Sequence, residues 1–340
     1  MNLIYVCPQL AFRKSMGAKV RRDGIIDGLK SRGHSIEIIE VGGEKTLFPQ
    51  LLRFRLRTDR SSIKQSFEEA DALIIEGLPL ALSELLLPII RKGLIKIHVD
   101  ICDSWLLLSS IDGRARNNIS QALFRVVKKS IALWALQKVN TNISISYSNQ
   151  RDLMTDARYL SAAQLLVVDN SFSAEQLEVK AFSYDDKGPI LVLGDGGYSP
   201  NQAMLEEAIQ WLERSDPSLI HQIRLVGPNW ESFKHERVEN LGWVDDLAEA
   251  FEGIFITFAV LRNGAGTKNK IIEALGRGYF VLGLASTVSP IQMASPGWVE
   301  FIGQSPEEIK RELSRRPMAQ TIPVPTWSEL VIPIERALGD

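Results

Sequence analysis

Two apolar, β-rich segments in the C-terminal half of the chain enclose a glycine-rich loop and one amphipathic helix. The first segment reads GIFITFAVL, the loop and helix read RNGAGTKNKIIEALGRG from Arg262 to Gly278, and the second segment begins YFVLGLAS. Ile271, Ile272 and Leu275 recur at helical spacing and give the helix an apolar face. Strands that are joined through a helix run parallel in one sheet. The pattern therefore predicts a strand–loop–helix–strand unit of a parallel α/β domain.

The loop has the composition of an anion-binding site. Gly264 and Gly266 allow the backbone to turn tightly and approach a ligand, and Thr267 is a good N-cap residue. A helix N-terminus presents unpaired N–H groups and the positive end of the helix dipole, and Lys268 and Lys270 add charge there. Phosphate is the anion that this arrangement favours, although the same composition also opens helices that bind no ligand.

Glu273 lies three residues after Lys270 and on the same face of the predicted helix. Its carboxylate can accept hydrogen bonds from hydroxyl groups beside the anion site. Because a phosphate next to hydroxyls describes a nucleotide, the helix start predicts a nucleotide-binding site.

The composition is that of a soluble globular protein with two domains. The chain has 340 residues, of which 45% are hydrophobic and 24% are charged. Cys7 and Cys102 are the only cysteines, which favours a reducing, cytoplasmic location and excludes a disulfide framework or a zinc-binding cysteine cluster. Acidic residues interrupt the longest apolar region, residues 70–90, so no membrane-spanning segment is expected.

The alternation of apolar segments and helical stretches occurs twice along the chain. We expect an N-terminal Rossmann-like domain over residues 1–180 and a C-terminal one over residues 188–322, joined by the polar segment AFSYDDKGP. A helix within residues 323–340 is expected to pack back towards the N-terminal domain. The predicted class is α/β with two doubly wound domains, whose facing carboxyl edges would form a ligand cleft. The first loop lacks a G-x-G-x-x-G motif, which disfavours a nicotinamide-dependent enzyme.

Polar side chains at the end of the strand LIKIHVDICDSW mark a second candidate site. Asp100 and Asp103 lie where open α/β sheets bind their ligands. His98 lies within the strand, so it is either a ligand-facing residue or a buried histidine with internal partners. Residues 1–170 are also basic, with 24 Lys and Arg against 17 Asp and Glu. That excess favours an anionic lipid, phosphorylated or glycan partner, although solvated basic residues are its commoner cause.

Four ordered blocks of the C-terminal half resemble the donor-binding domain of GT-B-fold glycosyltransferases, in particular the retaining family-4 group. They are ILVLGDGGYSPNQAMLEEAIQWL, IRLVGPNW, LGWVDDL and RNGAGTKNKIIEALGRGYFVLG, of which the last is the most specific. The N-terminal half is similar more weakly, through Gly17 with the helix that follows it, RGHSIEII, DICDS, YSNQRD and VVDNSF. The resemblance implies a GT-B fold and the transfer of a sugar from a nucleoside diphosphate to an acceptor hydroxyl.

The resemblance also implies roles for individual residues. Glu273 would hold the ribose hydroxyls, while Trp243 and Val244 would flank the base. The implied diphosphate ligands are the backbone of Gly264, Gly266 and Thr267 and the side chains of Lys268 and Lys270. The implied catalytic residues are Asp103, Lys270 and Glu273, and the implied acceptor residues are Gly17, His98, Asp100 and Asp103. Since positive charge and N–H donors stabilise the leaving nucleotide, no metal and no cofactor are expected.

Three features depart from the family pattern: Ala265 stands where a second glutamate is frequent, Cys102 stands where a histidine is frequent, and the Arg-plus-Lys pair often seen after the first strand of the donor domain is missing, with Asp195 and Tyr198 nearby instead. The main expectation is a retaining, metal-independent glycosyltransferase of glycan, glycolipid or glycoconjugate biosynthesis. The alternatives are a catalytically degenerate partner subunit of an active transferase, a GT-B-like epimerase of UDP-sugars, and a two-lobed ligand-binding sensor. The expected acceptor is a glycan, a lipid-linked or a small molecule, and no nucleic acid partner is expected. The expected location is cytoplasmic, with peripheral contact at the inner membrane face as an option.

Overall fold

The computed structural model describes two compact units, and each is described here by itself. The described residues are 1–8, 16–41, 66–67, 69–77, 95–104, 106–107, 129–130, 133–134, 136–137, 143–160, 164–171, 187–214, 222–262, 268–288, 293, 295, 297–316 and 325–339, with the backbone alone at 16–18 and 287. Within these ranges, unit 1 contains the residues up to 171 together with 325–339, and unit 2 contains residues 187–316. The C-terminal segment therefore belongs to unit 1.

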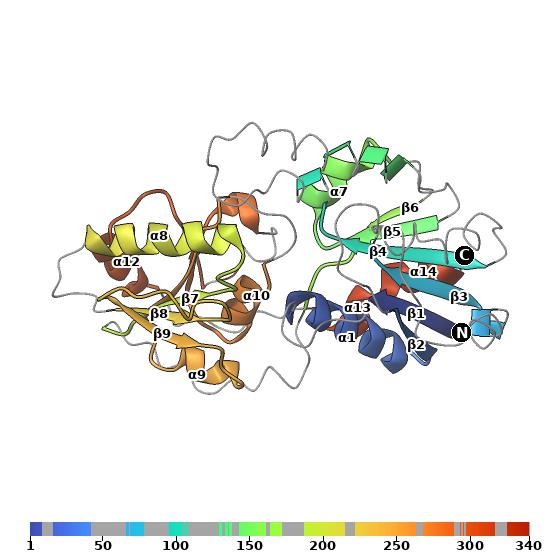
Figure 1. Cartoon of the computed structure of the whole chain (residues 1–340), viewed down its shortest axis with the longest axis horizontal. Helices are drawn as coiled ribbons and strands as arrows, with labels where there is room; N and C mark the ends of the chain where they lie inside the picture. The colour runs from blue at the N-terminus through green and yellow to red at the C-terminus, as the bar shows by residue number, and fades with distance from the viewer. Residues whose placement is uncertain are drawn as a thin grey trace. The chain divides into compact units, whose positions relative to one another are not determined.

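Unit 1 is built on a parallel sheet whose strand order is β2-β1-β3-β4-β5-β6 in the described part of the chain (Figure 1). Strands β1 and β3 are mostly apolar, as expected of a parallel sheet that is covered on both faces, whereas β5 alternates Ile and Ser and is buried nonetheless. The elements are β1 (Asn2–Pro8), α1 (Met16–Ser31), β2 (Ser35–Val41), β3 (Ala72–Glu76), β4 (Lys96–Cys102), β5 (Ile143–Tyr147), α7 (Gln150–Ala157) and β6 (Gln164–Val167).

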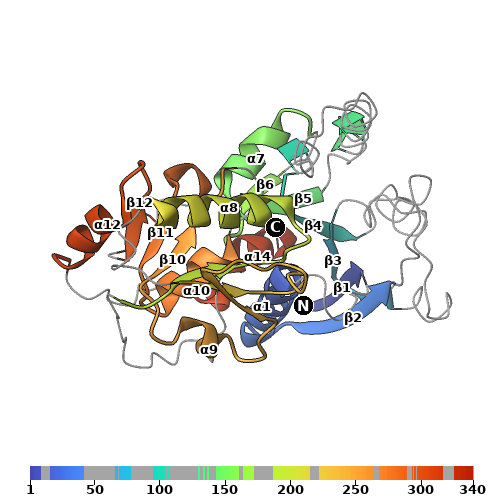
Figure 2. The same cartoon turned by 60° about the vertical axis from the view of Figure 1, so that its left-hand side comes forward.

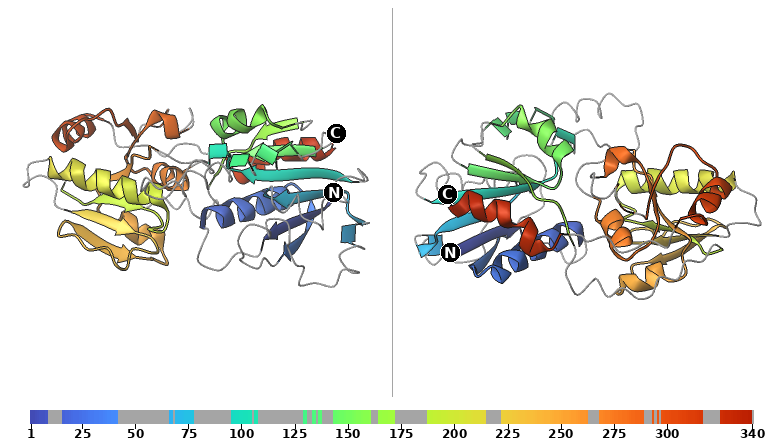
Figure 3. Two further views of the ribbon diagram at one scale, coloured as in Figure 1. Left: turned by 45° about the horizontal axis from the view of Figure 1, so that its top comes forward. Right: turned by 180° about the vertical axis from the view of Figure 1, so that it is seen from behind.

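The C-terminal helices α13 (Trp327–Leu330) and α14 (Ile332–Gly339) cover one face of this sheet together with α1, as the red helices in Figure 3 show. Trp327 packs so closely on α1 that a Cβ at Gly24 would lie 2.0 Å from its ring. Only glycine allows this approach, and the contact joins the two ends of the chain in one apolar core.

Unit 2 is also built on a parallel sheet, with the strand order β12-β11-β10-β7-β8-β9 in its described part (Figure 2). Helices α8 and α12 cover one face, and α9 and α10 cover the other. The elements are β7 (Ile190–Leu193), α8 (Ser199–Glu213), β8 (Ile223–Val226), β9 (Val238–Gly242), α9 (Leu247–Phe251), β10 (Ile256–Ala259), α10 (Asn269–Gly276), β11 (Val281–Gly283), the 3₁₀ helix η2 (Ala285–Thr287), β12 (Trp298–Glu300) and α12 (Pro306–Leu313).

The two sheets confirm the predicted α/β class with two doubly wound domains. The strand–loop–helix–strand unit is confirmed as β10, α10 and β11, but the helix begins one residue later than predicted, since Lys268 and not Thr267 is the N-cap residue. Among the described residues, no helix is long and apolar enough to cross a membrane. The cleft expected between the two domains concerns their relative placement and stays a prediction.

Candidate functional site

The carboxyl end of β7 leads into a loop, residues 194–198, that other parts of unit 2 hold firmly. The Asp195 carboxylate accepts hydrogen bonds from the backbone N–H of Gly197, at 2.7 Å, and from Asn229 Nδ2, at 2.6 Å. Trp230 Nε1 donates to the Gly194 carbonyl at 2.7 Å. These hydrogen bonds hold the loop in a defined conformation.

Glycine is required where this loop begins. A Cβ at Gly194 would lie 2.5 Å from Asn201 Cγ, and the φ angle of Gly194 is +153°. A Cβ at Gly227 would lie 2.0 Å from the Gly194 carbonyl oxygen. Two backbones and the Asn201 amide thus approach one another more closely than any side chain would allow.

Lys270 reaches this loop from the first turn of α10. Its Nζ donates hydrogen bonds to the Leu193 carbonyl at the end of β7 and, at 2.7 Å, to Asn201 Oδ1. Loss of hydration, and secondly repulsion from Lys268, lower the pKa of Lys270 to about 7. The Lys270 side chain is only partly buried. The two oxygens that accept hydrogen bonds from its amine are both neutral. The site therefore holds a cationic side chain without an anionic partner among the described residues.

Glu273 lies one turn further along α10 and is paired with Arg277. Arg277 Nε and Nη2 both lie 2.7 Å from Glu273 Oε1. Burial raises the pKa of the Glu273 carboxyl, and the charge and hydrogen bond of Arg277 oppose that rise. Among the described residues Oε2 has no hydrogen-bond partner, so this oxygen is available to a ligand hydroxyl.

The other residues predicted for the nucleotide are placed as follows. Trp243 directly follows β9, is 48% exposed and donates from Nε1 to Asp245 Oδ1 at 3.1 Å. Val244 is half-buried against the core beneath α9 and α10. Lys268 is half-buried at the N-cap of α10. Three predicted residues lie outside the described ones, namely Gly264, Gly266 and Thr267.

In unit 1, Asp100 is enclosed in a buried ion pair. Arg21 Nε and Nη2 donate to its two carboxylate oxygens at 2.8 and 2.7 Å, and Ser146 Oγ donates at 2.6 Å. Burial alone would raise the pKa of Asp100, but the charge and hydrogen bonds of Arg21 outweigh it and hold the pKa below its ordinary value. The exposed fractions of Arg21 and Asp100 are both 2%.

His98 belongs to the same network. Its ring nitrogens lie 2.8 Å from Ser144 Oγ and 2.9 Å from Ser146 Oγ, and burial lowers its pKa to about 4. Since Ser146 donates its only proton to Asp100, we infer that His98 Nε2 carries the proton that is donated to Ser146.

The expectation that Asp100 and His98 face an acceptor is therefore corrected. Their polar atoms are enclosed in the sheet and bonded to protein groups, so that they stabilise unit 1. Asp103 is placed differently, because it is half-buried in the turn that follows β4. In this turn Cys102 has a φ of +64°, and the Cys102 thiol lies 3.2 Å from Asp103 Oδ1. Gly17 lies in the first turn of α1. The acceptor roles of Asp103 and Gly17 stay predictions.

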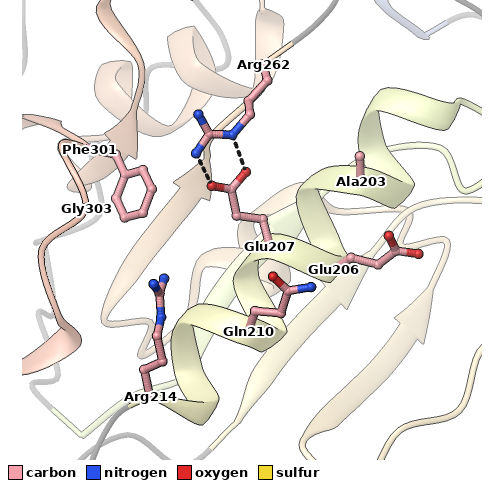
Figure 4. A pocket seen from close by; sticks show the side chains of 8 residues that line it. All are labelled: Ala203, Glu206, Glu207, Gln210, Arg214, Arg262, Phe301 and Gly303. Atoms are coloured by element: carbon pink, nitrogen blue, oxygen red, sulfur yellow. Dashed lines mark hydrogen bonds and ion pairs between the residues drawn. The ribbon is translucent and has the colours of Figure 1, made fainter.

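A separate hollow of about 460 Å³ lies on the outer face of α8 (Figure 4). Arg262 spans part of it and forks onto the Glu207 carboxylate at 2.5 and 3.1 Å. None of the residues around Lys270 lines it. The lining residues are Ala203, Glu206, Glu207, Gln210, Arg214, Arg262, Phe301 and Gly303. Within the described ranges, no group of three His, Cys, Asp or Glu side chains is placed to hold a metal ion.

The structure is similar in fold to several solved glycosyltransferases. HepE from Anabaena, solved with UDP and glucose, is 12% identical over 98% of this chain and 95% of its own, with a TM-score of 0.59. A glycosyltransferase from Rickettsia africae is 12% identical over 99% and 93%, with a TM-score of 0.56. The lipopolysaccharide outer core galactosyltransferase WaaB is 13% identical over 93% and 90%, with a TM-score of 0.55.

A protein of Listeria monocytogenes described as a candidate UDP-N-acetylglucosamine 2-epimerase is also similar, with 12% identity over 100% and 96% of the two chains and a TM-score of 0.50. The sequence matches no protein-family model and no curated protein. At these identities the likeness concerns the fold, and this chain has the GT-B fold.

Proposed function

We propose that this protein is a glycosyltransferase that binds a nucleoside-diphosphate sugar on unit 2 and transfers the sugar to an acceptor hydroxyl with retention. The observation that carries the proposal is the Lys270 amine at the carboxyl end of β7, which has neutral oxygens as its partners in the described structure. A diphosphate would supply the missing negative charge. The fold adds support, because solved structures of the same architecture include HepE with UDP and glucose.

The donor would lie along the first turn of α10. Lys270 and Lys268, with N–H groups at the helix start, would hold the diphosphate. Glu273 Oε2 would accept hydrogen bonds from the ribose, and exposed Trp243 would pack against the base beside Val244. Together these side chains would contact the diphosphate, the ribose and the base.

These residues would act by stabilising the negative charge of the leaving group. The nucleoside diphosphate gains negative charge as the bond to the sugar breaks, and a fixed ammonium stabilises that charge more in the transition state than in the substrate. The leaving phosphate would take the proton of the acceptor hydroxyl, and Asp103 would orient the acceptor. No metal enters this scheme.

The wider role that we propose is the biosynthesis of a glycan, glycolipid or other glycoconjugate in the cytoplasm. The basic N-terminal half would suit a lipid-linked or anionic acceptor and a peripheral contact with the inner membrane face, while a small-molecule acceptor fits the same chemistry.

A thermal-shift screen with UDP, GDP and dTDP tests the donor site, with uridine as the ligand without phosphate. We expect at least one diphosphate to raise the melting temperature, because a ligand that binds only the folded state stabilises it by mass action. Lys270→Ala should weaken binding by about 1–3 kcal/mol, the scale for a hydrogen bond to a charged group. Lys234→Ala, at an exposed lysine of unit 2, is the matched control and should bind like wild type.

Turnover separates the alternatives. Release of sugar or its transfer to an acceptor supports the transferase, whereas binding without turnover under any acceptor indicates a non-catalytic partner subunit. A change of configuration in the bound sugar, followed by NMR, would indicate an epimerase, a reading that the Listeria structure favours. Nucleotide affinity that is unchanged in Lys270→Ala would indicate a sensor with a different binding mode.

A further inference from the structure

Asn201 is the side chain that fixes the Lys270 amine. It lies in the first turn of α8 and is 6% exposed. Its Nδ2 donates to the Asp195 carbonyl at 2.9 Å, so its Oδ1 is the atom that faces Lys270 Nζ at 2.7 Å. The amide therefore has one orientation, set by the loop on one side and by the amine on the other.

The two contacts of Lys270 come from different elements. The Leu193 carbonyl ends β7, and Asn201 begins α8. An ammonium has three N–H groups, and two of them have partners among the described residues. The third has no partner in the described part of the chain and can donate to a ligand, in a direction that the first two contacts fix.

Among the described residues, the charged groups near the amine leave it without a counter-ion. Lys268, the residue that precedes α10, adds positive charge. On α10 itself, the Glu273 carboxylate is taken by Arg277. From the β7–α8 loop, the Asp195 carboxylate binds Gly197 N–H and Asn229 instead. An aspartate at position 201 would supply a counter-ion in the same space, and this chain has the neutral amide.

We propose that Asn201 is the positioning residue of the donor site: together with the Leu193 carbonyl it fixes Lys270 without neutralising it, so that the bound diphosphate becomes its counter-ion and binding brings one proton from solvent onto Nζ. The proposal rests on the proposed donor binding. The lowered pKa of Lys270, about 7, is consistent with an amine that is partly uncharged before the anion arrives.

Isothermal titration of UDP, GDP and dTDP at pH 8, in two buffers of different ionisation enthalpy, measures proton uptake directly. At this pH the nucleotides are fully ionised, since the second ionisation of a phosphate monoester lies near pH 6 in the reference scale. Wild type should take up close to one proton per nucleotide bound, and its affinity should fall up to tenfold per pH unit between pH 7.5 and 9.

Asn201→Asp is the decisive variant, because it keeps the size of the side chain and adds the counter-ion; it also loses the hydrogen bond from Nδ2 to the Asp195 carbonyl, a loss that Asn201→Ala shares and so controls for. It should abolish proton uptake and weaken nucleotide binding about tenfold or more, because an internal carboxylate competes with the phosphate. Asn201→Ala should keep the proton uptake but bind more weakly, since the amine loses one of its two fixed contacts. Gln210→Glu makes the same amide-to-carboxylate change further along α8, away from Lys270, and should behave like wild type.

The outcomes distinguish the two proposals. If no nucleoside diphosphate binds the wild-type protein, the donor site itself is wrong. If wild type binds one without proton uptake, or if Asn201→Asp takes up a proton and binds as wild type does, the donor site stands and the role of Asn201 is overturned. The wild-type measurement needs no folded variant, so a failure of Asn201→Asp to fold does not remove the test.

Discussion

The two sheets of this protein both end in charged side chains, but the charges are balanced in different ways. In unit 1, Arg21 pairs with Asp100, and the next residue, Arg22, pairs with Glu76 at 2.6 Å. In unit 2, Lys270 meets two neutral oxygens. The comparison teaches that paired charges at a strand end hold the fold, whereas a charge that the protein leaves unbalanced is available to an anion.

In unit 1, Arg21 makes further contacts besides its ion pair with Asp100. Arg21 also donates from Nη1 to the Val168 carbonyl at 2.6 Å and to Asn170 Oδ1 at 2.7 Å. It thereby joins α1, the end of β4 and the segment after β6, and these contacts all lie inside unit 1. We infer that its role is structural.

Removing Arg21 should have the largest effect of the changes considered. Arg21→Met leaves the Asp100 carboxylate buried without its cation, which is expected to cost about 3–5 kcal/mol of unfolding free energy. Urea denaturation, with hydrogen exchange to assign the transition to unit 1, measures the loss. Because the chain has two units, a single two-state fit is not assumed.

Two further variants sharpen this test. Lys19→Met breaks an exposed ion pair with Asp23 on the same helix and should change stability by less than about 1 kcal/mol. The double variant Arg21→Met, Asp100→Leu removes both charges and should recover much of the loss. If Arg21→Met alone were as stable as wild type, Asp100 would not need its partner, and the structural role would be wrong.

The sequence predicted the fold because parallel strands leave a strong pattern. Strand β7, with the sequence ILVL, is buried along its whole length and reads as a continuous apolar segment. The charges within such segments were harder to interpret. Asp100 in an apolar strand indicates either a ligand site or a buried pair, and its partner Arg21 lies 79 residues earlier on a helix whose packing no local pattern reveals.

The next largest expected effect is the loss of stability at acidic pH that His98 causes. Its pKa is lowered from 6.5 to about 4 by burial, so the unfolded state binds more protons between these values, and stability falls as the pH falls through this window. At about 1.4 kcal/mol per unit, the loss reaches up to about 3 kcal/mol. The acid sensitivity thus belongs to the paired network of unit 1.

His98→Leu removes the titrating group and should make the loss between pH 7 and pH 4.5 smaller by about 2–3 kcal/mol, whatever the variant costs at pH 7. Urea denaturation of wild type and variant at both pH values gives the difference. Since the carboxylates titrate in both proteins, they cancel in the comparison. Equal losses in the two proteins would show that His98 is not buried in its neutral form.

The sequence predicted Lys270 and Glu273 as site residues but not where the amine points. Their places on α10 follow from helical spacing, whereas the direction of a long side chain depends on what neighbouring elements present to it. Leu193 and Asn201 lie 77 and 69 residues earlier in the chain. The block ILVLGDGGYSPN contains both, yet nothing in its spacing says that the asparagine amide faces a lysine of another helix.

Lys270 provides the smallest expected effect on stability. This effect appears above pH 7, whereas that of His98 appears in acid. Its pKa is lowered from 10.5 to about 7, so above pH 7 the unfolded state binds more protons and the stability of unit 2 rises with pH, until both states lose the proton near pH 10.5. The slope is at most about 1.4 kcal/mol per unit, and partial exposure of the side chain reduces the gain between pH 7 and 9 to about 1–2 kcal/mol.

Lys270→Met should remove this rise and, at pH 6.5, should leave unit 2 as stable as wild type or slightly more so, because it replaces an ammonium that has no counter-ion in the described structure. The same variant should weaken nucleotide binding, as Lys270→Ala should. Denaturation at pH 6.5 and 9, with hydrogen exchange in unit 2, measures both the slope and the sign. A loss of stability at pH 6.5 like that of Arg21→Met would mean that the protein itself balances the Lys270 charge, and the contrast between the two sheets would disappear.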